Sequence, residues 1–290
     1  MHDLICGKLL GDGCLVKQSS RKPRFQFTHC INDIEYSWHC YEHLSSFLPL
    51  NPPKYKKNID SRVISGFTES YYVQSRTSEE ICRLYELWYP RSKKEIPFSY
   101  IEEHFTERTL AWWYQDDGHL KSQNGIPRKI ILSTDCFSIE ENQFLIKFLK
   151  KKYDLFFSKD AQNRLILYDQ FQIIFFLTLI DPHIHSSMNR KKLIFSKARQ
   201  IAERTTISLS SEINITHPTA EINSKYKNLS FLVALIENQI NLYENYKISK
   251  PSSVKRYQIK ITEDSRTTLS YLKQKTGLTI NQLTEWCFRL

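Results

Sequence analysis

The chain has 290 residues, of which 25% are charged and 41% are hydrophobic. This balance excludes collagen-like, low-complexity and disordered chains, and it provides enough apolar material for one or two globular domains. The formal net charge of +10 favours a partner that carries dense negative charge.

The predicted elements occur in the same order twice along the first two thirds of the chain. The first copy predicts a helix, strands, a helix, strands and a helix over residues 3–12, 14–29, 33–48, 62–76 and 79–89. The second copy predicts the same series over residues 107–117, 119–134, 138–153, 155–169 and 170–180. The longest apolar run, residues 171–180, is too short to cross a bilayer, so we expect no membrane partner.

A repeat in the sequence supports these two copies. An offset of 105 residues superimposes Asp12 on Asp117 and Thr28 on Ser133, and the register holds for more than 30 residues. Two copies of one unit predict a pseudo-twofold molecule. We therefore divide the chain into a first repeat at residues 1–105, a second repeat at residues 106–200 and a C-terminal extension at residues 201–290.

The extension differs from the repeats in composition. Residues 205–224 are rich in Ser, Thr, Ile and Asn, which predicts a linker or an irregular wrap. The rest predicts an amphipathic helix, a short strand and two further helices over residues 225–247, 256–262, 264–275 and 279–288. Residues 256–290 resemble a ribbon-helix-helix module, in which the ribbons of two chains pair and read DNA, so this module is the part expected to dimerise. An added helical cap is the alternative.

Two nine-residue segments lie at the repeat offset, residues 5–13 (ICGKLLGDG) and residues 110–118 (LAWWYQDDG). A basic element follows Tyr89 at residues 93–97 (KKEIP), and a second lies within residues 181–192 (DPHIHSSMNRKK). Together these segments resemble the LAGLIDADG homing endonucleases over about residues 4–195. The resemblance implies an α+β fold in which two pseudo-symmetric αββαββα repeats form a DNA-binding β-saddle, followed here by a mainly helical extension.

The resemblance places the acidic end of each signature at the active site. These residues are Asp12 and Asp117, and Asp116 is a rival to Asp117 because it stands where Ala or Gly is common. Gly7 and Gly11 lie four residues apart on one helical face, which lets a second backbone approach closely. Carboxylates brought together repel unless a cation joins them, so we expect a Mg²⁺ site made by Asp12 and Asp117, with Gly11 and Asp116 beside them. Mn²⁺ can substitute, and Ca²⁺ is expected to support binding without cleavage.

In this family the two basic elements supply a lysine near each active carboxylate. Here these catalytic candidates are Lys94 and Lys191, and Lys93 and Lys192 are adjacent alternatives. Such a lysine polarises water or stabilises the charge that develops on the phosphate during hydrolysis. The alternative is a solvated basic face that only holds phosphates.

Strand residues with alternate spacing are candidates for reading DNA. A twisted four-stranded sheet fits the major groove, where Arg reads guanine and Gln reads adenine. In the first repeat the candidates are Arg21, Arg24, Gln26, Thr28, Tyr72, Gln74 and Arg76. In the second repeat they are Lys121, Gln123, Arg128, Ser133 and Arg164. For each residue the alternative is an ordinary exposed strand face, and basic runs such as residues 54–57 are expected at phosphates or in solvent.

These observations predict a magnesium-dependent endonuclease with a monomeric core. The resemblance implies a long, imperfectly palindromic duplex target, hydrolysis of both strands with 3′ overhangs, and a mobile gene within an intron or free-standing. We expect a cytoplasmic protein, or one of the organelle matrix if the gene is organellar. The alternatives are an intron RNA maturase on the same fold and a DNA-binding regulator that does not cleave.

Overall fold

The computed structural model describes residues 1–195, 200–237, 242, 246 and 253–290, which form two compact units. The first unit comprises Met1–Lys121, Lys129–Tyr168 and Phe176–Lys192, and the second comprises Ser122–Arg128, Asp169–Phe175 and the described part of Leu193–Leu290. The first unit thus contains most of both repeats, and the second contains the extension. Within the described residues, no helix combines the length and the apolar character that crossing a membrane requires.

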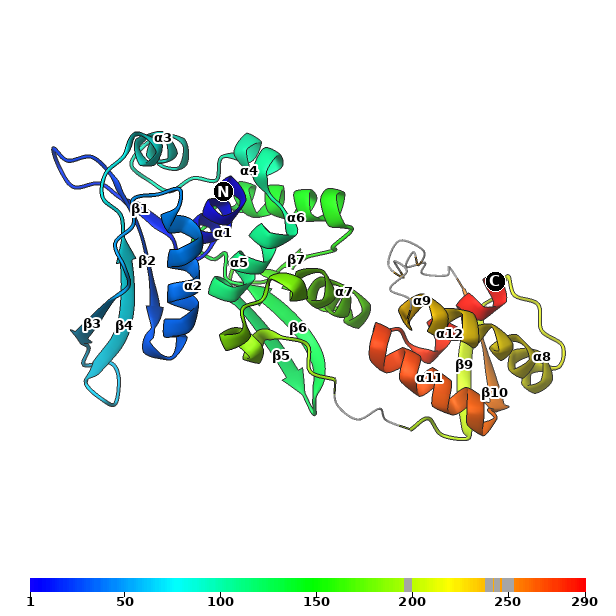
Figure 1. Ribbon diagram of the computed structural model, residues 1–290. Coiled ribbons are helices and arrows are strands. Elements are labelled where there is room, and N and C mark those ends of the chain that lie inside the picture. The colour runs from blue at the N-terminus through cyan, green and yellow to red at the C-terminus, as the bar shows by residue number, and fades with distance from the viewer. Residues whose placement is uncertain (196–199, 238–241, 243–245, 247–252) are drawn as a thin grey trace. The chain divides into compact units, whose positions relative to one another are not determined.

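The first repeat folds in the predicted order of elements (Figure 1). Its elements are α1 (His2–Leu10), β1 (Cys14–Val16), β2 (Arg24–Cys30), α2 (Ile34–Ser45), β3 (Lys54–Ile59), β4 (Phe67–Gln74) and α3 (Glu79–Trp88). The strands form one antiparallel sheet in the order β1-β2-β4-β3. The prediction of strands over residues 62–76 is wrong for β3, because residues 60–66 form the turn of this hairpin and Gly66 adopts a φ of +73° there.

The second repeat has the same architecture. Its elements are α5 (Glu107–Asp117), β5 (Gly118–Gln123), β6 (Ile126–Leu132), α6 (Ile139–Tyr153), β7 (Ser158–Lys159), β8 (Leu165–Leu167) and α7 (Gln170–Ile180). Its sheet has the order β5-β6-β8-β7, which matches the first sheet strand for strand. The repeat read from the sequence is therefore confirmed. The sequence patterns missed α4 (Phe98–His104), the short helix that precedes the second repeat.

The signature helices α1 and α5 pack against each other through small residues. A Cβ atom added to Gly7 would lie 2.8 Å from the carbonyl oxygen of Thr109 and 2.9 Å from Cβ of Trp112. A Cβ atom added to Gly11 would lie 2.5 Å from Cβ of Asp116. All three separations are shorter than real Cβ contacts, so each glycine is required by the close approach of the two helices. The expected helix crossing is confirmed.

Gly7→Ala is expected to lower the free energy of unfolding by about 1–3 kcal/mol, because the added methyl group overpacks the helix crossing. The higher helix propensity of Ala offsets about 1 kcal/mol at most. Denaturant unfolding measures the change, with Glu42→Ala on the exposed side of α2 as a control that should stay within about 0.5 kcal/mol of wild type. A Gly7→Ala protein as stable as wild type would show that α1 and α5 separate freely.

The extension contains more regular structure than the sequence predicted. Its elements are β9 (Arg204–Ser210), α8 (Pro218–Lys225), α9 (Leu229–Glu237), β10 (Val254–Lys260), α11 (Glu263–Thr276) and α12 (Ile280–Arg289). The prediction of a linker over residues 205–224 is wrong, because Ile207 and Leu209 alternate with polar residues and are fully buried as part of β9. Of the helix predicted over residues 225–247, α9 is described, and most of residues 238–247 lie outside the described residues.

The ribbon of the extension is formed within one chain. β10 pairs antiparallel with β9, which corrects the expectation that this ribbon pairs with that of a second chain. The predicted break between the last two helices is confirmed, since Gly277 ends α11 with a φ of +75° and the side chain of Thr279 caps α12. The apolar core beneath the ribbon includes Leu232, Ile259 and Leu283.

Candidate active site at the ends of α1 and α5

The two predicted acidic residues lie where the signature helices end. The chain leaves α1 at Leu10 and reaches Asp12 through Gly11, and Asp117 is the last residue of α5. Burial, and then the charges of Asp12 and Asp116, raise the pKa of Asp117 to about 7. Burial and the charge of Asp116 also raise the pKa of Asp12 to about 6, against the opposite effect of nearby lysines. The repulsion among these carboxylates marks a place where a cation is favourable.

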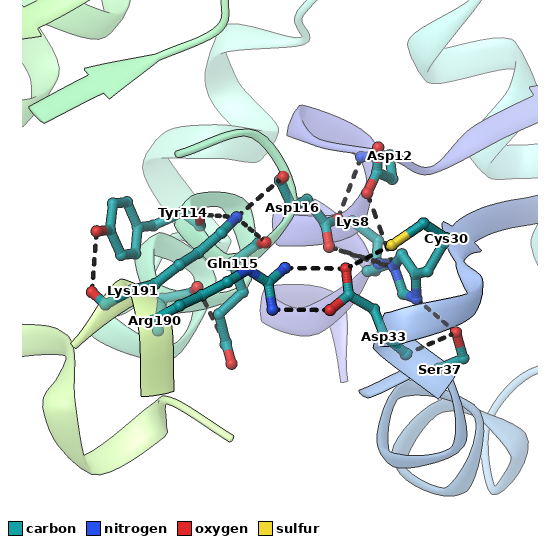
Figure 2. Close-up of polar contacts among 12 residues, drawn as sticks. Lys8, Asp12, Cys30, Asp33, Ser37, Tyr114, Gln115, Asp116, Arg190 and Lys191 are labelled. Carbon is teal, nitrogen blue, oxygen red and sulfur yellow. Dashed lines mark hydrogen bonds and ion pairs between the residues drawn. The ribbon is translucent and has the colours of Figure 1, made fainter. Parts of the chain in front are cut away.

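The third carboxylate, Asp116, is held by an ion pair inside the protein. Its Oδ1 lies 2.8 Å from Nζ of Lys8, and neither side chain has any exposed surface. Its Oδ2 accepts a hydrogen bond of 3.1 Å from the backbone N–H of Asp12 (Figure 2). Burial alone would raise the pKa of Asp116, but the adjacent ammonium group of Lys8 outweighs burial and lowers it to about 2. Asp116 is therefore an anion with its own counter-ion, and it fixes the backbone of Asp12.

A buried histidine continues this network, and the sequence analysis missed it. Nζ of Lys8 lies 2.9 Å from Nε2 of His29, and Nδ1 of His29 lies 2.8 Å from Oγ of Ser37. Burial and the neighbouring Lys8 lower the pKa of His29, so we assign a neutral ring that accepts from Lys8 and donates to Ser37. The Ser37 hydroxyl in turn donates to the carbonyl of Asp33. The signal in the sequence was Lys8 itself, a charged residue in the apolar part of the first signature.

Two sets of groups at this site have the composition of a metal site. Ligand atoms of Asp12, His29 and Asp116 all lie within 4.8 Å of one another. However, Lys8 contacts both Nε2 of His29 and Oδ1 of Asp116, so a cation there would compete with the ammonium group. Among the described residues no ammonium group hydrogen-bonds the carboxylates of Asp12 and Asp117, although the charges of nearby lysines act on both. Hard divalent cations prefer such oxygen donors.

Each of the two predicted lysines binds backbone carbonyl groups near the end of the signature of its own repeat. Nζ of Lys94 donates to the carbonyl of Gly13 at 3.2 Å. Nζ of Lys191 donates to the carbonyls of Tyr114 and Asp116 at 3.2 Å each, and also to that of Gln115 (Figure 2). Each ammonium group therefore binds backbone at the end of one signature.

The surroundings of the four lysines differ. Burial lowers the pKa of both Lys94 and Lys191, and the nearby carboxylates oppose this effect. Of the adjacent alternatives, Lys93 is exposed and Lys192 lies 3.5 Å from Asp181 in an ion pair. Of these four lysines, only Lys94 and Lys191 are thus placed at the carboxylates.

The segment that follows α7 connects the two repeats. In this segment, the guanidinium group of Arg190 forms a two-point ion pair with the Asp33 carboxylate at 2.8 and 2.9 Å (Figure 2). The Tyr114 hydroxyl donates to the carbonyl of Lys191, and the backbone N–H of His185 donates to Oε1 of Gln115 at 2.7 Å. These contacts hold Lys191 at the end of α5.

The predicted reading face of the first sheet is present. Phe25 and Phe27 on β2 are buried, whereas the alternate residues point to the other face. There Gln26 is opposite Gln74 and Thr28 is opposite Tyr72 across β2 and β4. Side chains of this face are linked, since Arg24 donates to Gln74 at 3.2 Å and Gln74 donates to Gln26 at 3.1 Å.

Two lysines of the basic run at residues 54–57, which was expected at phosphates or in solvent, belong to this face. Lys54 is opposite Tyr72 and Lys56 is opposite Ser70, so both belong to β3 and share the side of the sheet that carries Gln26. Their run of positive charge concealed the strand, because it suggested a solvated loop. Arg21 and Arg76 lie outside the strands, before β2 and after β4, and both are exposed.

The candidates in the second repeat have more varied surroundings. Lys121 and Gln123 occupy alternate, exposed positions of β5, and Arg128 is exposed on β6. Ser133 follows β6 and its backbone N–H donates to the carbonyl of Asp117 at 3.1 Å. Arg164 is held by its neighbour Asp160 through two hydrogen bonds of 2.7 and 3.0 Å. The guanidinium group of Arg164 is therefore less free than the others to contact a base.

Residues 2–172 match the model of the LAGLIDADG DNA endonuclease family. The chain belongs to this family. The family assignment agrees with the paired signature helices and with the matching order of strands in the two sheets. It covers the site described above except for Lys191 and the segment around it.

Several known proteins are similar to this chain in sequence. An uncharacterized protein of Methanocaldococcus jannaschii is 32% identical over 200 residues, which cover 66% of this chain and 72% of that protein. The intron-encoded endonuclease ai4 of Dictyostelium discoideum is 29% identical over 129 residues, which cover 42% and 77%. The cytochrome b mRNA maturase bI2 of Saccharomyces cerevisiae is 26% identical over 205 residues, which cover 65% and 46%.

A solved structure shares the fold. The homing endonuclease I-WcaI bound to its DNA recognition sequence superimposes with a TM-score of 0.59 and 23% sequence identity. The match covers 67% of this chain and 86% of that chain. The homing endonuclease fold predicted from the two signatures is thus confirmed.

Proposed function

We propose that this protein is a site-specific endonuclease that hydrolyses both strands of a long, imperfectly palindromic DNA duplex and leaves 3′ overhangs. The observation that carries the proposal is the pair Asp12 and Asp117 at the ends of two packed helices, each with its pKa raised by burial and by like charge. A carboxylate pair of this kind is the expected surrounding of a divalent cation.

In this proposal Asp12 and Asp117 hold Mg²⁺, with the backbone of Gly11 beside them. The cation supplies a Lewis acid for the phosphodiester oxygens and lowers the pKa of a bound water. Asp116 positions the site instead of holding the metal, because Lys8 and the N–H of Asp12 engage both of its oxygen atoms. This arrangement favours Asp117 over Asp116 as the second ligand.

Lys94 and Lys191 act on the phosphate in this proposal. Each ammonium group is held in place by carbonyl groups at the end of a signature, so it carries a fixed positive charge near the carboxylates. A preorganised cation of this kind stabilises the negative charge that develops on the phosphate during hydrolysis. One lysine per repeat corresponds to one cleaved strand per repeat.

The two sheets supply the sequence specificity in this proposal. On the first sheet, Arg24, Gln26 and Gln74 are linked side chains of the kind that read guanine and adenine. Lys54 and Lys56 on the same face are suited to phosphates. The repeat offset places Ile131 where the first copy has Gln26, so the two half-sites are expected to differ.

The maturase similarity supports a second candidate, an RNA-binding function on the same fold. The match spans less than half of the yeast maturase. The intact pair of aspartates favours the endonuclease, although a maturase can retain it.

A selection experiment tests the proposal and separates these alternatives. The purified chain is bound to a randomised duplex library in Ca²⁺, the bound DNA is recovered, and Mg²⁺ is added before the cut ends are sequenced. The expected result is a long, nearly palindromic consensus with staggered cuts at its centre. A consensus that is bound but never cut would contradict the nuclease and support a regulator. No consensus at all, together with binding to a folded intron RNA, would support the maturase.

A further inference from the structure

The extension carries a surface that the proposed catalytic site does not use. β9 and β10 pair antiparallel over their whole length, from Val254 opposite Ser210 to Lys260 opposite Arg204. One face of this ribbon covers the core of the unit, where Ile207 and Ile259 are at most 1% exposed. The opposite face points away from that core.

The outward face of the ribbon is polar and basic. Apart from Val254 with the buried Ser210 at its far end, its cross-strand pairs are Arg204 with Lys260, Thr206 with Gln258, and Ser208 with Arg256. None of these six residues is acidic, and all except the half-buried Ser208 are exposed. The neighbouring Glu203 places its Oε1 2.7 Å from Nζ of Lys260. In the described part of the chain, nothing hydrogen-bonds the side chains of Thr206, Arg256 or Gln258.

The ribbon is complete within one chain. β10 begins 50 residues after the start of β9. Among the described residues, β9 is followed by the α-helices α8 and α9 and β10 by α11 and α12, so the described part of the extension has two β-α-α halves. The halves are joined by a hydrogen bond of 2.9 Å between the hydroxyl groups of Tyr226 and Thr284. Oδ1 of Asn281 accepts from the backbone N–H of Ser208 at 3.0 Å, which satisfies part of the outer edge of β9. The outward side chains therefore stand on a supported platform.

We propose that the outward face of the β9–β10 ribbon is a second duplex-DNA-binding surface. A two-stranded ribbon fits the major groove of B-form DNA, and Arg256 and Gln258 are the residue types that read guanine and adenine there. Arg204 and Lys260 lie at one end of the ribbon, where cations suit the phosphates. The deep and narrow major groove of A-form RNA does not admit a ribbon, so the partner is DNA.

The test uses the full-length chain in Ca²⁺ and a randomised duplex DNA pool. Selections are run in parallel for wild type, for the ribbon variant Arg256→Ala with Gln258→Ala, and for the sheet variant Arg24→Ala with Gln26→Ala. We expect the wild-type consensus to contain a segment that the ribbon variant no longer selects and the sheet variant still selects. The ribbon variant should bind the wild-type consensus at least about tenfold more weakly. Because Arg256 and Gln258 are placed at base edges and not at phosphates, the slope of log affinity against log salt should change by less than about 0.9, the value of one phosphate contact.

Lys227→Ala is the matched control, because it removes one exposed cation from the same unit outside the ribbon. Its affinity should stay within about twofold of wild type. Circular dichroism and thermal unfolding verify that each variant folds. The proposal is overturned if the ribbon variant keeps the wild-type consensus and affinity, if Lys227→Ala loses as much, or if duplex RNA competes as well as duplex DNA. Wild-type protein that binds no duplex overturns it too. If wild-type protein selects the ribbon-dependent segment but cleaves no DNA, the result counts against the proposed nuclease function and not against this DNA-binding surface.

Discussion

Asp12→Asn and Asp117→Asn are each expected to slow DNA cleavage by at least about 10³-fold, because each removes a charged oxygen ligand from the proposed Mg²⁺ site. Affinity for the selected duplex in Ca²⁺ should stay within a few-fold of wild type, since neither residue belongs to the reading faces of the sheets. Gel assays of single-turnover cleavage and of binding measure the two quantities. Asp135→Asn, an exposed carboxylate after β6, is the matched control and should cut like wild type. If either active-site variant cuts DNA at the wild-type rate, the assignment of these aspartates to the active site is wrong.

The same two substitutions are expected to raise the stability of the metal-free protein above neutral pH. The ordinary pKa of an aspartate is 3.8, and burial with like charge raises it to about 6 for Asp12 and about 7 for Asp117 in the folded protein. The folded state therefore binds more protons than the unfolded state between about pH 4 and 7, and stability falls as the pH rises through this window. Removing either charge should raise Tm at pH 8 by about 2–4 °C, which corresponds to about 1 kcal/mol. Added Mg²⁺ should stabilise wild type more than the variants, and a lower Tm for both variants would contradict repulsion at the site.

Lys8→Met is expected to destabilise the protein by about 3–5 kcal/mol, because it leaves the Asp116 carboxylate buried without its counter-ion. The double variant Lys8→Met with Asp116→Leu should recover much of that loss, since two apolar side chains replace a buried ion pair at little cost. Denaturant unfolding of the two single variants and the double variant completes the thermodynamic cycle.

An exposed ion pair provides the comparison for this cycle. Arg83 and Glu79 lie one turn apart on α3 at 3.6 Å, and 69% and 90% of their side chains are exposed. Arg83→Ala should therefore cost less than about 1 kcal/mol. If Lys8→Met costs no more than Arg83→Ala, the Lys8–Asp116 pair contributes nothing particular to the fold.

The features that could be predicted from the sequence are those carried by local pattern or by the repeat. The alternation of Phe25 and Phe27 with polar residues predicts a strand with one buried face, and the offset between Asp12 and Asp117 predicts two packed helices. β9 escaped prediction because its Ser and Thr residues mimic a linker, although Ile207 and Leu209 carry the same alternation. β3 escaped because its sequence, KYKKNI, is a basic run without alternation of buried and exposed residues.

Contacts between distant residues account for what was missed at the site. Lys8 and Asp116 are 108 residues apart, so no local pattern connects them, and His29 joins them only once β2 has packed against α1. The choice between Lys94 and Lys93 also depends on folding, because only the packed chain shows which ammonium group reaches the carbonyl of Gly13.

The buried Lys8–Asp116 pair also makes each repeat depend on the other for the counter-ion of a buried charge. One partner comes from the first repeat and the other from the second, and both are sealed from water. A hybrid protein that took its second half from a relative with a small residue at position 116 would bury the Lys8 ammonium group without a counter-ion. Recombining halves of different relatives to obtain new target specificities therefore requires that positions 8, 29 and 116 be exchanged together.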